Sequence, residues 1–346
     1  MKAGLNKLLI TLGLASAALL TGCERPPIDA VQTGFRGTAM VEINNPRTQE
    51  KLAAENVAPP GVPAPADGPK ASAVYKNVKV LGNLSEAQFT TFMVAMTSWI
   101  APKEGCGYCH NVQNFAEDSV YTKNVARTMI QMTQAINSNW NAHVKDTGVT
   151  CYTCHRGNAI PKEVWFDTAE KKKGGMLGNR NGQNEPSPVV GYSDLPNQPF
   201  SSYFLAGKGA ARITGPTALP TGHVKSIQET EYVFAVMIHQ SNALGVNCTY
   251  CHNSRAFADW EQSPPQRAQA WYGIQMVKDV NSNYIVPTTP LFPPHRLGPD
   301  GDVAKANCAT CHQGVNKPLL GKSMLKDYPY LVGPPTGKPL VVAQKK

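Results

Sequence analysis

Eight of the nine cysteines occur in four pairs of identical spacing, and a histidine follows each pair. This C-x-x-C-H pattern is the attachment signature of c-type haem. The two thiols add to the vinyl groups of the porphyrin, and the histidine binds the iron from the proximal side. The sequence therefore predicts four covalently bound c-type haems, held by Cys106, Cys109 and His110; Cys151, Cys154 and His155; Cys248, Cys251 and His252; and Cys308, Cys311 and His312.

Other kinds of cysteine chemistry fit this pattern less well. A disulfide framework does not place a histidine after every second cysteine. A thioredoxin-like redox site would occur once, between a strand and a helix. Zinc sites pair two C-x-x-C units but do not require the trailing histidine. The fourfold recurrence favours a tetrahaem c-type cytochrome.

Each haem iron needs a second axial ligand, or it stays open for chemistry, and methionine and histidine are the usual candidates. A segment with a helical pattern precedes each motif, so each helix is expected to lie across a haem face and offer a ligand from its apolar stripe. The first segment opens with a capping box at Ser85, and the second runs from about Thr122 to Asn139. The third opens at Ser226, and the fourth opens with Ser263 as its cap and Pro264 as its first residue. The methionines of these segments include Met93, Met96, Met129, Met132, Met237 and Met276.

The second and fourth of these helices are copies of one repeat. Met129-Ile-Gln-Met132 aligns with Gly273-Ile-Gln-Met276, and both copies continue to Asn-Ser-Asn. If Met129 binds the second haem, the fourth helix has lost the equivalent ligand. His143, in the loop after the second helix, is the natural substitute, and Met276 is the competing ligand.

The N-terminus predicts export and lipidation. Residues 1–22 carry two lysines followed by an apolar run that is too short to span a bilayer but has the length of a signal-peptide core. The run ends in Leu20-Thr21-Gly22-Cys23, which resembles a bacterial lipobox. A diacylglycerol on Cys23 would supply two acyl chains, enough for stable anchoring. We expect a periplasmic protein held on the membrane surface.

Composition and charge exclude several other classes. The chain has 346 residues, of which 42% are hydrophobic and 16% charged, so it is neither disordered nor a coiled coil. The formal charge is +9, but no block of Lys and Arg occurs, and two propionates on each haem would offset most of the positive charge. We expect no nucleic-acid partner.

From Cys23 to His312 the chain resembles the tetrahaem cytochrome subunits of purple bacterial photosynthetic reaction centres. The resemblance implies two haem pairs related by a local twofold axis, with one haem bound by two histidines and three by His and Met. His239 is the alternative to Met237, because the two lie roughly opposite each other around a helix. The axial ligands implied are Met93 with His110, Met129 with His155, Met237 with His252, and His143 with His312.

The expected fold is mainly α with much irregular loop, as four units of helix plus C-x-x-C-H in two pseudo-twofold pairs. The signal peptide covers residues 1–22. The expected parts of the mature chain are a lipidated extended segment at 23–83, the first haem pair at 84–167, a connector at 168–222, the second haem pair at 223–325 and a tail at 326–346.

The function implied is electron transfer without a substrate, so the protein is expected to be an electron carrier and not an enzyme. By resemblance, a soluble c-type cytochrome or a high-potential iron–sulfur protein would donate electrons near the first haem. The third haem would lie nearest the bacteriochlorophyll special pair of the core subunits. The alternative is a periplasmic respiratory cytochrome or an oxyanion reductase, which requires one five-coordinate iron.

Overall fold

The structure is a computed structural model that describes residues 28–32, 40–167, 187–207, 211 and 225–333. The expected signal peptide, Cys23, most of the expected connector and the end of the expected tail lie outside these residues. Within the described part of the chain, no helix is both long enough and apolar enough to cross a membrane.

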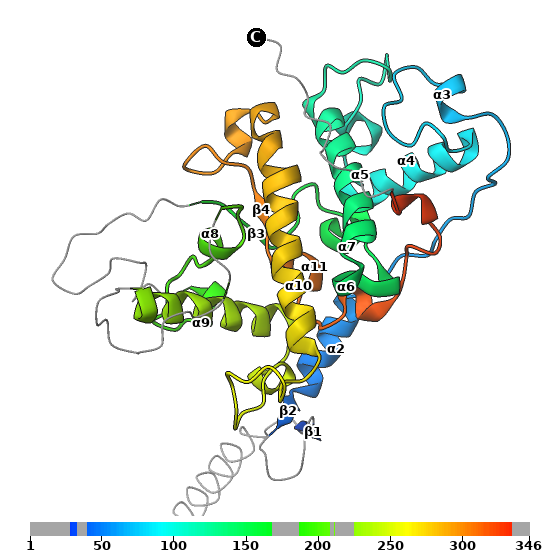
Figure 1. The fold of residues 1–346 in the computed structure, drawn as a ribbon. Helices are drawn as coiled ribbons and strands as arrows, with labels where there is room; N and C mark the ends of the chain where they lie inside the picture. The colour runs from blue at the N-terminus through cyan, green and yellow to red at the C-terminus, as the bar shows by residue number, and fades with distance from the viewer. Residues whose placement is uncertain (1–27, 33–39, 168–186, 208–210, 212–224, 334–346) are drawn as a thin grey trace, which may run out of the picture.

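The described residues are largely helical with long irregular connections, as the sequence predicts (Figure 1). The four longest helices precede the four C-x-x-C-H motifs, and α5 and α10 run side by side in the middle of the molecule (Figure 1). Their bounds are α4 Glu86–Ile100, α5 Tyr121–Asn139, α9 Lys225–Leu244 and α10 Gln266–Asp279.

The remaining elements are short. Two antiparallel strand pairs, β1 with β2 and β3 with β4, are the only sheets among the described residues. Their bounds, with those of the short helices, are β1 Asp29–Gln32, β2 Val41–Asn44, β3 Val164–Trp165, β4 Lys305–Ala306, α2 Pro46–Glu55, α3 Ala71–Val74, α6 Asn141–Val144, α7 Cys151–His155, α8 Phe200–Tyr203 and α11 Cys308–His312.

Local sequence signals place most helix starts. Ser85 caps α4, because its Oγ accepts the backbone N–H of Gln88 at 3.1 Å and the Gln88 side chain accepts the N–H of Ser85 at 3.3 Å. The start of α10 differs from the prediction: this helix begins at Gln266, two residues after Pro264. The Ser263 hydroxyl is occupied elsewhere, since it accepts from the Arg267 guanidinium at 2.8 Å and donates to the carbonyl of Asp259 at 2.5 Å.

Three apolar clusters form the side-chain core. The first joins α4 to α7 and to residues 319–331, and there Trp99 packs edge-to-face on Tyr328 with ring centres 4.9 Å apart. The second joins β3, α8, α9 and α10, and the third lies between α5 and α10. Tyr328 and Leu331 fall in the expected tail, yet both are fully buried in the first cluster. The end of the described chain therefore returns to the first half of the molecule.

The Asn that recurs in the two repeat copies makes the same contacts in both: Asn137 lies in α5, and Asn281 lies in the π-helical turn Val280–Ile285 that continues α10. Asn137 accepts the N–H of Val149 at 2.7 Å and donates to its carbonyl at 2.9 Å. Asn281 accepts the N–H of Ala306 and donates to its carbonyl, both at 2.9 Å. Val149 and Ala306 each stand two residues before the first cysteine of a motif. Each of these two asparagines thus fixes the backbone that leads into the second or the fourth motif.

Replacing Asn281 with Ala should destabilise the protein. The change removes the partner of the Ala306 N–H, at a cost of about 1–3 kcal/mol. It also takes one donor from the carbonyls of Phe204 and Ala306, the second of which keeps Trp165 Nε1 as a donor at 2.8 Å. We expect a lower guanidinium midpoint for the holoprotein, followed by circular dichroism. Asn283→Ala is the matched control, because Asn283 is exposed on the same segment. Equal midpoints for the two variants would show that the Asn281 contacts contribute nothing.

Candidate haem centres

The histidine of every motif is oriented in the same way. In each, Nδ1 lies within hydrogen-bonding distance of a backbone carbonyl a few residues further along the chain, which leaves Nε2 as the free ring nitrogen. Such a bond fixes the tautomer and the direction of a metal-binding imidazole. The four contacts are His110 to Phe115 at 3.2 Å, His155 to Asn158 at 2.9 Å, His252 to Phe257 at 3.0 Å and His312 to Val315 at 3.0 Å.

The motifs fall into two structural kinds. The first and third contain a 3₁₀ turn, and their histidine rings lie against an aromatic ring five residues on, with centres 5.1 Å and 4.9 Å apart. The second and fourth form the short helices α7 and α11, each opened by a capping box and each followed by a residue in the left-handed region. The chain therefore contains the same pair of unlike motifs two times, as the first and second motifs and as the third and fourth.

The second and fourth motifs meet at a local twofold axis. Cys154 Sγ and Cys311 Sγ are 2.8 Å apart. Arg156 donates to the carbonyl of Cys311 at 3.2 Å, and Gln313, its equivalent in the other motif, donates to the carbonyl of Cys154 at 3.4 Å. These reciprocal hydrogen bonds join the two halves of the molecule through their motifs.

The rings of His143 and His312 are neighbours, with their centres 6.1 Å apart and their planes inclined at 69°. Metal–imidazole bonds of about 2.0 Å on opposite sides of one metal put two ring centres roughly 6.3 Å apart. The Nδ1 of His143 contacts the carbonyl of Gln269 at 2.9 Å, so its Nε2 is again the free nitrogen. This pair of imidazoles fits one iron between them.

Gly273 makes room for His143. A Cβ at position 273 would lie 2.6 Å from Cε1 of the His143 ring, closer than real contacts allow. Gln269 Nε2 also donates to the carbonyl of His143 at 3.0 Å, and α6 packs on α10. The His143 ring can occupy its position only because residue 273 has no side chain, as the repeat alignment suggests.

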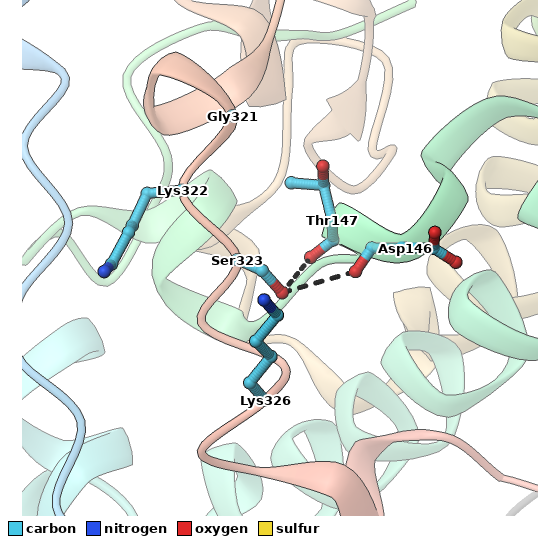
Figure 2. Close-up of a pocket in the computed structure, with 6 residues that line it drawn as sticks. All are labelled: Asp146, Thr147, Gly321, Lys322, Ser323 and Lys326. Atoms are coloured by element: carbon cyan, nitrogen blue, oxygen red, sulfur yellow. Dashed lines mark hydrogen bonds between the residues drawn. The ribbon is translucent and has the colours of Figure 1, made fainter.

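A surface hollow of about 310 Å³ lies beside the turn that follows α6, and Figure 2 shows the residues that line it. Ser323 donates to the carbonyls of Asp146 at 3.3 Å and Thr147 at 2.9 Å (Figure 2). None of the predicted ligands lines the hollow. Its hydrogen bonds tie the segment after His143 to the C-terminal part of the chain.

The methionines separate into two groups. Met93, Met129, Met132 and Met237 are half-buried, each at the edge of one apolar cluster, so burial does not distinguish Met129 from Met132. Met96 and Met276 are each 7% exposed and belong to the clusters themselves. Met276 packs with Ile136 of α5 and Val280 in the third cluster, so it is occupied as core. This arrangement disfavours Met276 as a ligand.

His239 lies inside the second half of the molecule. It is 5% exposed, and its ring packs edge-to-face on Phe200 with centres 4.6 Å apart. Its Nε2 has no hydrogen-bond partner in the part of the chain that the structure describes. His239 thus belongs to the core between α9 and α8, while Met237 is the more exposed side chain on α9.

Burial keeps the candidate axial histidines neutral. It lowers the pKa of His110, His155 and His252, and it also lowers that of His143. Burial lowers the pKa of His312 to about 4, and the neighbouring His143 and Arg156 act in the same direction. A neutral imidazole keeps the lone pair that binds iron.

Sequence reasoning found the motifs and the repeat, but it missed the residues around the twofold axis. Asn56 is 1% exposed and follows α2. It accepts from Arg156 at 2.8 Å and donates to the carbonyl of Gln313 at 3.5 Å. The different residues after the two histidines, Arg156 and Gln313, were the one visible signal.

Comparison with known proteins places the chain among its relatives. The family described as "Photosynthetic reaction centre cytochrome C subunit" matches residues 24–332. A photosynthetic reaction center cytochrome c subunit from Rubrivivax gelatinosus is 54% identical over 325 residues, which cover 93% of this chain and 88% of the relative. The protein of the same name from Thermochromatium tepidum is 47% identical, over 92% of this chain and 78% of the relative. The one from Roseobacter denitrificans is 41% identical, over 94% of this chain and 92% of the relative. With its C-x-x-C-H motifs and these matches along nearly its whole length, the chain belongs to the family of cytochrome c subunits of photosynthetic reaction centres, which serve photosynthetic electron transfer.

Proposed function

We propose that this subunit holds four c-type haems and carries electrons along them to the photo-oxidised special pair of the reaction-centre core. The observation that carries the proposal is the neighbouring pair His143 and His312, whose 6.1 Å ring spacing fits one six-coordinate iron. When bound, each haem supplies a centre that gains or loses one electron. The protein supplies ligands, burial and charge.

The axial ligands follow from the helices and motifs. His143 and His312 bind the fourth iron, while each of the other three takes one motif histidine and one half-buried methionine. With both axial positions filled, no iron is open to a substrate, so the subunit is an electron carrier. The three mixed pairs are Met93 with His110, Met129 with His155, and Met237 with His252.

The contacts between motifs suggest the order of transfer. The second and fourth motifs touch through Cys154 and Cys311, and α7 packs on α4 while α11 packs on α9. Electrons then enter at the first motif and pass through the second and the fourth to the third. A soluble c-type cytochrome or high-potential iron–sulfur protein is the proposed donor at the first motif.

The orientation on the membrane follows from the N-terminal segment. Asn247, next to the third motif, donates to the carbonyl of Val41 in β2 at 2.6 Å. β1 pairs with β2 and begins at Asp29, and the six residues from Cys23 to Asp29 reach at most about 22 Å. With Cys23 lipidated on the periplasmic face, the third motif lies at the membrane end. The helices α3 and α4 lie at the opposite end (Figure 1).

A short flash given to native membranes tests this function. The account predicts prompt oxidation of haem, seen as loss of the reduced α-band, with the same kinetics as the re-reduction of the special pair. A photo-oxidised special pair with silent haems would contradict the donor role. Carbon monoxide binding by the reduced native protein would favour the alternative, an oxyanion reductase with an open iron.

Gly273→Ala tests the fourth ligand set. The added Cβ collides with the His143 ring, so the imidazole must leave its position beside His312, and we expect the fourth iron to lose a ligand. We expect the reduced variant to bind carbon monoxide at one haem per chain. Ala268→Ser, at an exposed position on α10, is the control. A variant that binds no more carbon monoxide than the control would remove His143 from the ligand set.

A further inference from the structure

The residues on the two sides of the twofold axis between the second and fourth motifs differ in charge. The two residues that follow the motif histidines adopt the same left-handed conformation, with φ of 46° at Arg156 and 48° at Gln313. Each reaches across the axis to the carbonyl of the opposite motif's second cysteine. One is a permanent cation and the other is neutral. The backbone is therefore symmetric at this point while the electrostatics are not.

The guanidinium of Arg156 is held on the side of the fourth motif. Its N–H groups donate to the carbonyl of Cys311 at 3.2 Å and to Asn56 Oδ1 at 2.8 Å. A further donation, to the carbonyl of Thr153 at 3.4 Å, ties the base of the side chain to its own motif. All of these acceptors are neutral, and no ion pair to Arg156 occurs within the described residues. The backbone carbonyl of Glu55 is a further acceptor at 3.3 Å, and the exposed Glu55 carboxylate favours the charged guanidinium without forming an ion pair with it. The charge is thus fixed in place and has no direct carboxylate partner among the described residues.

Asn56 makes this arrangement specific. It is almost completely buried, and it touches both twofold-related residues, accepting from Arg156 and donating to the carbonyl of Gln313. Its second donation, to the carbonyl of Leu52 at 2.8 Å, fixes the amide to the end of α2. An aspartate would have the same shape, but its carboxylate would cancel the charge of Arg156. The position carries the neutral amide instead.

We propose that Arg156, which belongs to the second motif, sets the reduction potential of the fourth haem, and that Asn56 is the residue that positions it. The inference rests on the proposed function, in which His312 and Cys311 hold that haem. Reduction adds one negative charge at the iron, and a fixed nearby cation favours the reduced state. Arg156 therefore raises the potential of the fourth haem, which its two imidazole ligands would otherwise leave low.

The test is a redox titration of the purified holoprotein, followed in the haem α-band. Arg156→Gln gives both motifs the same residue, and we expect the fourth haem to shift to lower potential while the third does not move. The fourth haem is identified as the component that Gly273→Ala changes. Arg156→Lys keeps the charge without the same hydrogen bonds, so it should retain most of the native potential.

Two further variants keep the test independent of folding defects at Arg156. Asn56→Asp leaves Arg156 in place but pairs it with a carboxylate, so the fourth haem should again shift to lower potential. The exchange Arg156→Gln with Gln313→Arg moves the cation onto the carbonyl of Cys154. In that variant the second haem should rise in potential while the fourth falls.

The outcomes separate the two proposals. Fewer than four covalent haems per polypeptide in the titrated native protein overturns the proposed function, and this inference with it. Four components with an unmoved fourth haem in both Arg156→Gln and Asn56→Asp overturn the inference alone. An equal loss of potential in Arg156→Lys and Arg156→Gln would assign Arg156 a purely structural role and also overturn it.

Discussion

The contact between α7 and α11 is the constraint on which the rest of the structure depends. Two short helices, 157 residues apart in sequence, meet with the Sγ atoms of their second cysteines 2.8 Å apart. Everything attached to them must then lie on one side or the other of a local twofold axis. The long helices α5 and α10 run beside this contact. Asn137 of α5 and Asn281, in the π-helical turn that continues α10, each fix the backbone that enters one motif.

The duplication explains the architecture, and its departures from symmetry explain the chemistry. One departure is Gly273, which replaces the methionine of the other copy and leaves space that the His143 ring fills. Another is the Arg156 and Gln313 pair, which gives the same backbone two different charges. In both places the repeated scaffold is kept and a single side chain is exchanged. The repeated unit of this chain thus provides two unlike local environments.

Much of this structure could be predicted from the sequence because the decisive signals are local. The motif spacing identifies the haem chemistry, and a capping box fixes the start of α4 at Glu86. Even the link between Gly273 and His143 follows from aligning two segments of the same chain. The start of α10 was predicted two residues too early, because the Ser263 hydroxyl bonds to Arg267 and to the carbonyl of Asp259 and does not cap the helix.

Contacts between distant segments could not be predicted in this way. Nothing near Tyr328 indicates that it packs on Trp99, and nothing near Asn56 indicates that it reaches Arg156 and Gln313. These contacts depend on the fold as a whole, since apolar and amide side chains of the same kind occur at many surface positions. The contacts around the twofold axis are recognised only from the three-dimensional positions of the second and fourth motifs.

The central claim is that all four motifs carry covalent haem and that the chain folds around them. The most direct test is the number of covalently bound haems per polypeptide in the purified subunit, from the pyridine haemochrome spectrum and amino-acid analysis of the same sample. The account predicts four haems that stay with the polypeptide after acid–acetone extraction. A value of three or fewer in fully matured protein would contradict it, because at least one motif would then be a structural element without its iron.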